Sequence, residues 1–270
     1  MKALSTLAQS VRASTTMAID TQFKKMRAEG IDVIGFSVGE PDFPTPERIK
    51  QAGIRAIEAD QTKYTPTPGT LAVRQAVCQR LEEDWGLHYT TDEVVVTGGG
   101  KPVLYTALKA LVNPGDEVIL PAPYWVSYYE LIQMVGGTPV VVETTEENGF
   151  NLTPQQLRQA ITPKTKALIL NSPSNPTGMI YSRQHLEDLA QVCLEADLYV
   201  IADEMYSKLI FDGKEFVSFP TLSEAVKAHT ILVNGASKTY AMTGWRIGFA
   251  AASREITQVM NNYLSHSLSG

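Results

Sequence analysis

Strand-like apolar runs alternate with amphipathic stretches along the chain from Glu47 onward. Short apolar runs bounded by turn residues predict seven strands, at residues 93–97, 117–121, 139–143, 166–170, 198–203, 230–235 and 245–251. Apolar residues recur at helical spacing over residues 47–60 and 182–196. This alternation predicts an α/β fold in which most strands run parallel and helices pack against the sheet.

The connection between the last two predicted strands is the exception to this arrangement. Only residues 236–244 separate them, whereas a parallel crossover needs about a dozen residues or more. We therefore predict that the last strand is antiparallel. Residues 1–45 differ from the rest, because a polar, helix-capable stretch leads into the Gly- and Pro-containing passage VIGFSVGEPDFPTP (33–46), which predicts extended chain packed apart from the main domain.

Composition and charge exclude several classes of protein. The 270 residues are 44% hydrophobic, and 23 Lys and Arg face 29 Asp and Glu, for a formal net charge of −6. The chain can bury a large core, but it lacks the basic surface that a nucleic-acid partner requires. Only Cys78 and Cys193 are present, far apart, and no stretch has the pattern of a signal peptide or a membrane span. We predict a cytoplasmic protein without a membrane partner.

Common catalytic and nucleotide-binding motifs are incomplete in this sequence. The four histidines never approach metal-ligand spacing, so no metal site is predicted. The glycine run 98–100 is followed by Lys-Pro and then Val, which fits neither the P-loop nor the G-x-G-x-x-G pattern. Residues 235–239 end in Thr where the G-x-S-x-G motif requires Gly. These mismatches weaken the mononucleotide, dinucleotide and serine-hydrolase interpretations.

The glycine run still has the features of a phosphate site. It follows a predicted strand and precedes a helical stretch, with Pro102 at a position where a first-turn proline is tolerated. Unpaired N–H groups and the positive end of the helix dipole attract an anion there, and glycines allow it to approach the backbone. Taken alone, however, an ordinary strand-to-helix turn is the favoured interpretation.

Three further segments lie at predicted strand ends. NSPSNPTG (171–178) and ADEMY (202–206) follow neighbouring strands in the chain, and NGASKTYAMTGWRIG (234–248) contains Lys238 and Arg246 eight residues apart. Open α/β sheets bind ligands at the carboxyl ends of their strands. A lysine and an arginine at this spacing are informative only if both reach one phosphorylated ligand.

Together these segments resemble the fold-type I, pyridoxal 5′-phosphate (PLP) dependent class I/II aminotransferases, and among them the bacterial aspartate aminotransferases. The resemblance covers the chain in order and is specific. Its motifs are GEPDFPTP (39–46), KYTPTPG (63–69), VTGGGK (96–101), NPGDEVILPAPYWVSY (113–128), NSPSNPTG (171–178), ADEMY (202–206) and SKTYAMTGWRIG (237–248). It implies the PLP-transferase type I fold, a mostly parallel seven-stranded sheet sandwiched by helices. It further implies that residues 1–45 are an N-terminal arm and small-domain segment, and that residues 46–270 are the large PLP-binding domain.

The resemblance also implies roles for individual residues. Lys238 matches the lysine that holds the aldehyde cofactor covalently and, once displaced, transfers the substrate Cα proton. Asp203 matches the carboxylate that keeps the pyridine nitrogen protonated, although a helix cap is the alternative for an Asp at this place. Asn175 and Tyr206 match the donors to the ring's phenolic oxygen, and Trp125 matches the aromatic residue that stacks on the ring. Without the resemblance, Trp125 and Tyr206 would be interpreted as core residues.

The phosphate-binding residues follow from the same match. Gly99, Gly100 and the helix start would hold the phosphate, with the Arg246 guanidinium as a bidentate partner. Tyr64 matches a tyrosine that reaches the phosphate in the neighbouring subunit, which implies a homodimer. The chain departs from many relatives at Gly235, where they have a phosphate-binding serine, and Ser237 is the candidate replacement.

Substrate preference depends on Lys101. A subgroup of bacterial aspartate aminotransferases has a lysine here for the distal carboxylate of the substrate, so the resemblance implies transfer of an amino group from L-aspartate, or a related amino acid, to a 2-oxo acid such as 2-oxoglutarate. The alternative role of Lys101 is to neutralise the phosphate, and aromatic amino acids or prephenate also remain open as substrates.

The C-terminal segment of the family, with the arginine that binds the α-carboxylate and most of the small domain, has no counterpart here, so we expect a truncated chain with an incomplete small domain. A PLP-dependent carbon–sulfur β-lyase and a non-catalytic PLP-binding protein are the alternative functions.

Overall fold

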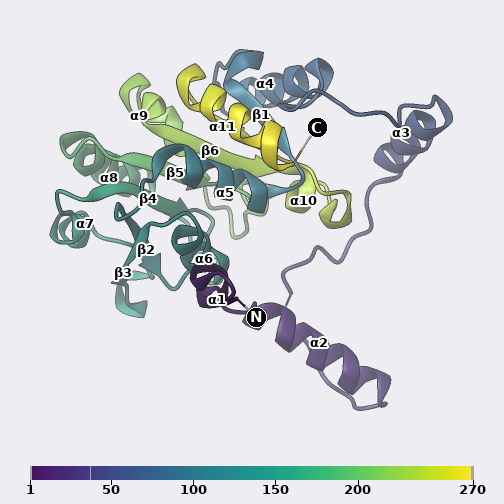
Figure 1. Cartoon of the computed structure of the whole chain (residues 1–270), viewed down its shortest axis with the longest axis horizontal. Helices are drawn as coiled ribbons and strands as arrows, with labels where there is room; N and C mark the ends of the chain where they lie inside the picture. The colour runs from purple at the N-terminus through teal and green to yellow at the C-terminus, as the bar shows by residue number, and fades with distance from the viewer. Residues whose placement is uncertain (1, 37, 269–270) are drawn as a thin grey trace.

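Seven strands form one mixed sheet in the order β1-β7-β6-β5-β4-β2-β3 (Figure 1). The computed structural model describes residues 2–36 and 38–268. The strands are β1 (Val94–Thr97), β2 (Glu117–Ala122), β3 (Thr138–Glu143), β4 (Thr165–Asn171), β5 (Tyr199–Asp203), β6 (Thr230–Gly235) and β7 (Gly248–Ala251). Neighbouring pairs from β3 to β6 are parallel, and β7 is antiparallel to both β1 and β6. The predicted fold class and the antiparallel last strand are confirmed.

The first and last strands begin later than predicted, for local reasons. The last strand begins at Gly248 instead of residue 245, because Thr243–Trp245 forms a 3₁₀ turn and Arg246 follows in the left-handed region at φ 61°. The first strand begins at Val94 because Glu93 ends the 3₁₀ turn η1 (Thr91–Glu93), where its carboxylate accepts a hydrogen bond from the backbone N–H of Thr90. In both places the residues form a short turn, although the pattern of apolar residues predicts that they belong to the strand.

Helices cover both faces of the sheet. They are α1 (Thr6–Ser10), α2 (Thr15–Ala28), α3 (Glu47–Glu58), α4 (Leu71–Trp85), α5 (Gly100–Leu111), α6 (Ser127–Met134), α7 (Pro154–Ala160), α8 (Arg183–Glu195), α9 (Glu224–Ala228), α10 (Ala236–Thr239) and α11 (Arg254–Ser267). One core cluster contains Leu104 of α5, Ile132 of α6 and Met260 of α11, and another contains Leu157 of α7 and Leu186 of α8. Residues of the two clusters alternate along the strands, so the clusters lie on opposite faces of the sheet. A layer of helices therefore packs on each face.

The two predicted helices form close to their expected bounds, but only one buries its apolar side chains. In α8 the hydroxyl of Ser182 caps the backbone N–H of His185 at 3.3 Å, and Leu186 is 1% exposed. In α3, by contrast, Ile54 and Ile57 are 45% and 69% exposed. The helix lies out from the sheet in Figure 1, and a large part of its apolar face is exposed.

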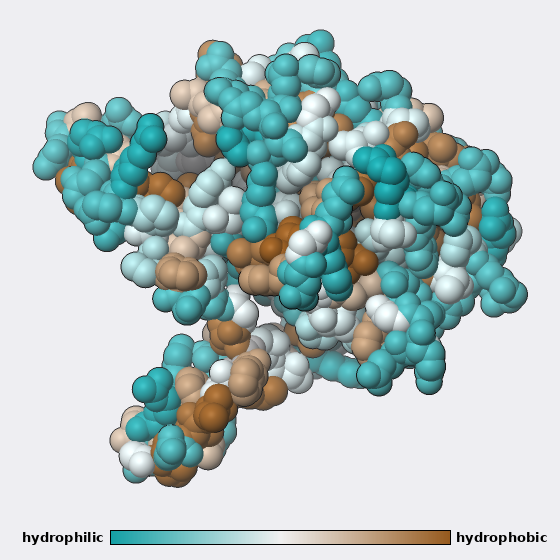
Figure 2. All heavy atoms as spheres, turned by 180° about the vertical axis from the view of Figure 1, so that it is seen from behind, coloured by the Kyte–Doolittle hydropathy of each residue, from teal (hydrophilic) through white to brown (hydrophobic). Residues whose placement is uncertain are grey.

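The N-terminal segment lies largely apart from the sheet. Helix α1 adjoins α6, where the backbone N–H of Arg12 donates to Glu130 Oε2 at 3.1 Å, whereas α2 projects away (Figure 1). Figure 2 shows hydrophobic residues along this projecting helix, and Met17 and Ile19 are 60% and 58% exposed. The division into 1–45 and 46–270 stays a prediction. Within residues 2–36 and 38–268, the structure contains no helix long and apolar enough to cross a membrane.

Candidate functional site

The carboxyl ends of β1, β2, β4, β5 and β6 meet at one edge of the sheet, because β7 alone runs the other way. Asn171 and Asp203 end β4 and β5 and are paired in register. The amide of Asn171 donates to the backbone carbonyl of Asp203 at 2.8 Å. Neighbouring strand ends therefore present their side chains to a common space, as expected for a ligand site in an open α/β sheet.

Asp203 is a buried carboxylate with two protein donors. It is 5% exposed, and its Oδ2 accepts the Tyr128 hydroxyl at 2.7 Å while Oδ1 accepts the backbone N–H of Met205 at 3.1 Å. Burial raises the pKa of Asp203, and these two hydrogen bonds oppose the rise. A buried carboxylate with only neutral donors is suited to stabilising a cationic ligand group beside it.

Asn175 and Tyr206 form a polar pair beside this carboxylate. The Asn175 amide donates to the Tyr206 hydroxyl at 3.2 Å, and the backbone N–H of Asn175 donates to Asn171 Oδ1 at 2.7 Å. Burial raises the pKa of Tyr206, so the phenol keeps its proton at neutral pH. Both side chains can therefore donate to an anionic oxygen.

Lys238 follows β6 on the short helix α10 and points toward the same pair. Its Nζ lies 5.9 Å from the centroid of the Tyr206 ring and donates to the backbone carbonyl of Gly39. Burial lowers the pKa of Lys238, as does the charge of Arg246, while Glu40 opposes both. A lysine with a lowered pKa has more of the neutral amine that acts as nucleophile or base.

The passage after the N-terminal arm adjoins the turn that follows Lys238. The Trp245 indole donates to the Thr45 hydroxyl at 3.1 Å, and the Thr243 hydroxyl donates to the Glu40 carboxylate. In its described residues, 33–36 and 38–46, the passage forms neither helix nor strand. It does not pack away from the main domain throughout, because these contacts reach the candidate site.

The glycine turn between β1 and α5 packs tightly against Arg246. Gly99 has φ +107°, and a Cβ on it would lie 2.8 Å from Arg246 Cζ. A Cβ on Gly248 would lie 2.5 Å from the backbone nitrogen of Gly100. Glycine is needed at both positions because a Cβ would clash with neighbouring protein atoms, and at Gly99 also because of its positive φ. The turn and the guanidinium thereby form one surface with anion-binding character at the start of α5.

Lys101 and Trp125 form a second pair at this edge. The Lys101 ammonium lies 4.9 Å from the centroid of the Trp125 ring, and that ring meets Tyr128 edge to face with centroids 5.4 Å apart. Burial and the charge of Arg246 lower the pKa of Lys101. The indole thus connects a cation to the tyrosine that donates to Asp203.

Most of the predicted site residues are brought together, with one exception. Contacts link Lys238, Asp203, Tyr206, Asn175, Trp125, Lys101, Arg246, Gly99 and Gly100 through neighbours in the structure. Tyr64 lies outside this cluster and is 93% exposed. Ser237 is buried, 6% exposed, and Gly235 closely approaches the carbonyl of Ile247.

Two polar residues of the cluster, Tyr128 and Asn171, were not predicted. Both lie inside segments that carry the family resemblance, Tyr128 three residues after Trp125 and Asn171 at the start of NSPSNPTG. This position in a motif is the only sequence signal for them. Their contacts to Asp203 join residues 75 and 32 positions apart, and single-sequence patterns do not register such pairings.

The fold and this polar cluster are those of an aminotransferase of class I and II. Residues 31–269 match the aminotransferase class I and II family, and the chain belongs to that family. It is 50% identical to the aspartate aminotransferase of Bacillus sp. (strain YM-2) over 95% of this chain, and 47% identical to the aspartate/prephenate aminotransferase of Cereibacter sphaeroides over 96% of it. The chain spans 65% of the length of each of these relatives.

Solved structures give the same result. The aspartate aminotransferase from Thermus thermophilus with maleate superposes with a TM-score of 0.96 at 42% identity, covering 100% of this chain and 70% of that one. The aspartate aminotransferase from Rhizobium meliloti gives a TM-score of 0.95 at 40% identity, covering 100% of this chain and 68% of that one. The PLP-transferase type I fold is confirmed.

Members of this family use PLP, and the residues present fit it. The site supplies a partly buried lysine, a buried carboxylate, two donors for an anionic oxygen, and a glycine turn beside a guanidinium. These are the groups that an aldehyde, a pyridinium, a phenolate and a phosphate require on one molecule. Among the described residues, no cluster of three His, Cys, Asp or Glu side chains could hold a metal ion.

Glu204, next to Asp203, is a second buried carboxyl. It is 3% exposed, accepting the Ser218 hydroxyl and the backbone N–H of Phe219 at 2.7 Å each. Burial raises the pKa of Glu204 to about 8. Its hydrogen bonds fix the chain after β5. The free-energy cost of burying the Glu204 carboxyl is lowest when it is protonated.

This raised pKa predicts a stability difference that depends on pH. The unfolded chain ionises Glu204 near its ordinary value of 4.5, so folding stability falls as pH rises from there toward 8, by about 1.4 kcal/mol per unit at most. Glu204→Gln removes the titration while keeping an acceptor for Phe219. We expect the variant to gain thermal stability relative to wild type as pH rises from 5 to about 8, measured by thermal unfolding.

An exposed carboxyl on α8 gives the control. Glu187→Gln alters a side chain that is 44% exposed, with Arg183 at 3.9 Å, and its difference from wild type should stay nearly constant over the same range. A Glu204→Gln variant that loses stability equally at every pH would contradict the raised pKa.

Proposed function

We propose that this chain is the cofactor-binding part of an aminotransferase that takes the amino group from L-aspartate, delivers it to a 2-oxo acid such as 2-oxoglutarate, and works as a homodimer. The observation that carries the proposal is the convergence of Lys238, Asp203 and Tyr206 at one sheet edge. The names of the relatives support aspartate as the donor. Cytoplasmic location is a further prediction.

When bound, PLP supplies an aldehyde and an electron-accepting ring. Lys238 Nζ would hold the aldehyde and, as a free amine, would be the base that accepts the substrate Cα proton and returns it. Asp203, whose two oxygens are fixed by Tyr128 and the Met205 N–H, would keep the ring nitrogen protonated.

The other residues orient and bind. Asn175 and Tyr206 would donate to the phenolic oxygen, and Trp125 would pack against the ring. Gly99, Gly100 and Arg246 would bind the phosphate through backbone N–H groups and the guanidinium. Tyr64 would contact the phosphate in the partner subunit, which its exposure permits.

The visible absorption spectrum of the chain with PLP, before and after L-aspartate, tests this proposal. We expect a band that requires Lys238 and that L-aspartate removes, with Lys238→Ala as the blank. Oxaloacetate should accumulate, whereas a carbon–sulfur β-lyase would release pyruvate and ammonia without an acceptor. A band that L-aspartate leaves unchanged would support the cofactor site and contradict amino transfer by this chain.

Lys101 is proposed to bind the distal carboxylate of the substrate. Lys101→Met removes one charge-assisted hydrogen bond, so KM for L-aspartate should rise about tenfold to a hundredfold. KM for L-phenylalanine, which has no second carboxylate, should change little. Steady-state kinetics with both donors measures the difference.

The alternative role of Lys101 makes a different prediction. If Lys101 serves only to neutralise the phosphate, Lys101→Met weakens PLP binding and affects both donors alike. Lys109→Met, on the same helix α5, is the matched control and should alter neither KM nor PLP affinity.

A further inference from the structure

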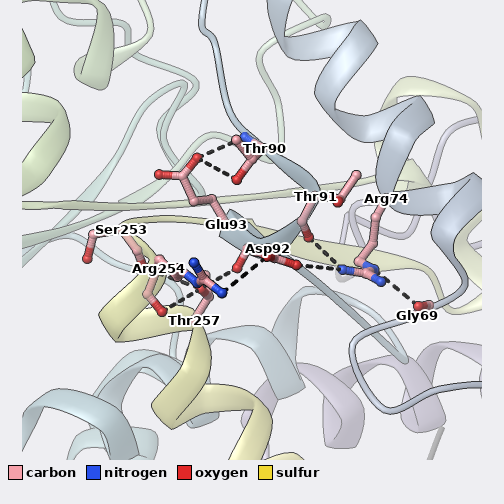
Figure 3. A network of polar contacts seen from close by, with 9 residues as sticks. All are labelled: Gly69, Arg74, Thr90, Thr91, Asp92, Glu93, Ser253, Arg254 and Thr257. Atoms are coloured by element: carbon pink, nitrogen blue, oxygen red, sulfur yellow. Dashed lines mark hydrogen bonds and ion pairs between the residues drawn. The ribbon is translucent and has the colours of Figure 1, made fainter.

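Arg74 on helix α4 joins two segments that are separate in sequence (Figure 3). Its Nη1 donates to the backbone carbonyl of Thr91 at 2.7 Å, and its Nε donates to the backbone carbonyl of Gly69 at 3.3 Å. Its side chain is only 15% exposed. One rigid guanidinium therefore fixes the distance between the end of the KYTPTPG segment (63–69) and the turn η1.

Hydrogen bonds from other segments of the chain hold the η1 turn in place. The Thr257 hydroxyl of α11 donates to the Asp92 carbonyl at 2.7 Å, and the Ala252 N–H donates to the Glu93 carbonyl at 3.1 Å. Together with Arg74, these donors occupy three successive carbonyls of η1. The ion pair between Arg254 and Asp92 adds little, because the two side chains are 77% and 59% exposed.

The KYTPTPG segment is hydrogen-bonded to β1 near its C-terminal end. The N–H of Val96 on β1 donates to the Pro68 carbonyl at 3.0 Å, and a Cβ on Gly69 would lie 2.9 Å from Val96 Cβ. Tyr64, at the other end, is 93% exposed. The direction in which Tyr64 projects thus depends on the contacts that fix the backbone at Gly69.

We propose that Arg74 is a positioning residue that orients the segment carrying Tyr64, so that the Tyr64 hydroxyl meets the phosphate of the cofactor in the partner subunit. The proposal rests on the proposed function, which supplies the homodimer and the phosphate contact. Arg74 itself touches neither cofactor nor substrate. It acts on the phosphate through the backbone of Gly69 and the side chain of Tyr64.

A double-mutant cycle with PLP as the probe tests this role. Apoprotein of the full chain is titrated with PLP, and the dissociation constant is measured for wild type, Tyr64→Phe, Arg74→Lys and the double variant. Lysine keeps the charge but cannot bridge two carbonyls with a planar fork. We expect each single variant to weaken PLP binding about three- to tenfold, and Arg74→Lys to have less than about a twofold effect once Tyr64 is phenylalanine.

Arg80→Lys is the matched control, because Arg80 lies on the same helix and pairs only with the exposed Glu83 and the nearby Asp84 in the described structure. It should leave PLP affinity unchanged. Equal weakening by Arg74→Lys in both Tyr64 backgrounds would overturn the positioning role, since a general structural effect does not depend on Tyr64.

Two further outcomes separate this inference from the proposed function. If Tyr64→Phe leaves PLP affinity unchanged while the Lys238-dependent band forms, the positioning role is wrong and the proposed function stands. If the wild-type chain gives no Lys238-dependent band with PLP, the proposed function fails and this inference fails with it.

Discussion

Replacing Lys238 with alanine is expected to lower the rate at which L-aspartate reacts with the PLP-loaded chain by about a thousandfold or more. The variant loses the proposed covalent anchor and an amine that lies 5.9 Å from the centroid of the Tyr206 ring. Burial lowers the pKa of Lys238, so a larger fraction of its amine is neutral, and able to accept a proton, than in an exposed lysine at the same pH. Stopped-flow absorbance after mixing with L-aspartate measures the rate.

Two variants separate base chemistry from charge. Lys238→Arg keeps a cation at the site but remains protonated, so it should be as slow as the alanine variant. Lys208→Ala removes a lysine that pairs with Asp84 at 2.8 Å, and it should leave the rate unchanged within about twofold. A Lys238→Ala chain that keeps a tenth of the wild-type rate would contradict both assigned roles.

The sheet was predictable because its signals are local. Apolar runs of strand length, separated by helical spacing, gave all seven strands, and the short 236–244 connection gave the antiparallel direction of β7. The uncovered face of α3 was not predictable, since apolar spacing shows which side chains share a face and not what covers them. Ile57 is 69% exposed in this chain.

The site was predictable from motifs, but its supporting contacts were not. The family resemblance located Asp203, while the Tyr128 hydroxyl that fixes it comes from a helix 75 residues earlier. The sequence indicates one role for the glycine run 98–100, which is to let a phosphate approach the backbone, and none for Gly248. In the structure, Gly99 and Gly248 also give room for protein atoms, a constraint that depends on which segments meet in three dimensions.

Replacing Asp203 with asparagine is expected to separate catalysis from stability. The asparagine oxygen can accept the Met205 N–H, and its amide can donate to the Tyr128 oxygen, so both partners of Asp203 keep a hydrogen bond. Asparagine carries no charge, however, so it could not stabilise a proton on the ring nitrogen electrostatically. The rate with L-aspartate should fall about a hundredfold to a thousandfold. Since burial raises the pKa of Asp203, the ionised carboxylate costs folding free energy at neutral pH. The apoprotein variant should therefore unfold at a temperature no lower than that of wild type.

Glu204→Gln is the matched control for this experiment, because Glu204 is the adjacent residue, is equally buried and is bound instead to Ser218 and Phe219. It should keep the rate within a few-fold and change stability with pH, whereas Asp203→Asn changes the rate. Added PLP should raise the unfolding temperature of Glu204→Gln more than that of Asp203→Asn, because only the former keeps the carboxylate that we propose to pair with the ring. If Asp203→Asn lowers stability and leaves the rate intact, Asp203 is a structural cap and its assignment to the ring nitrogen is wrong.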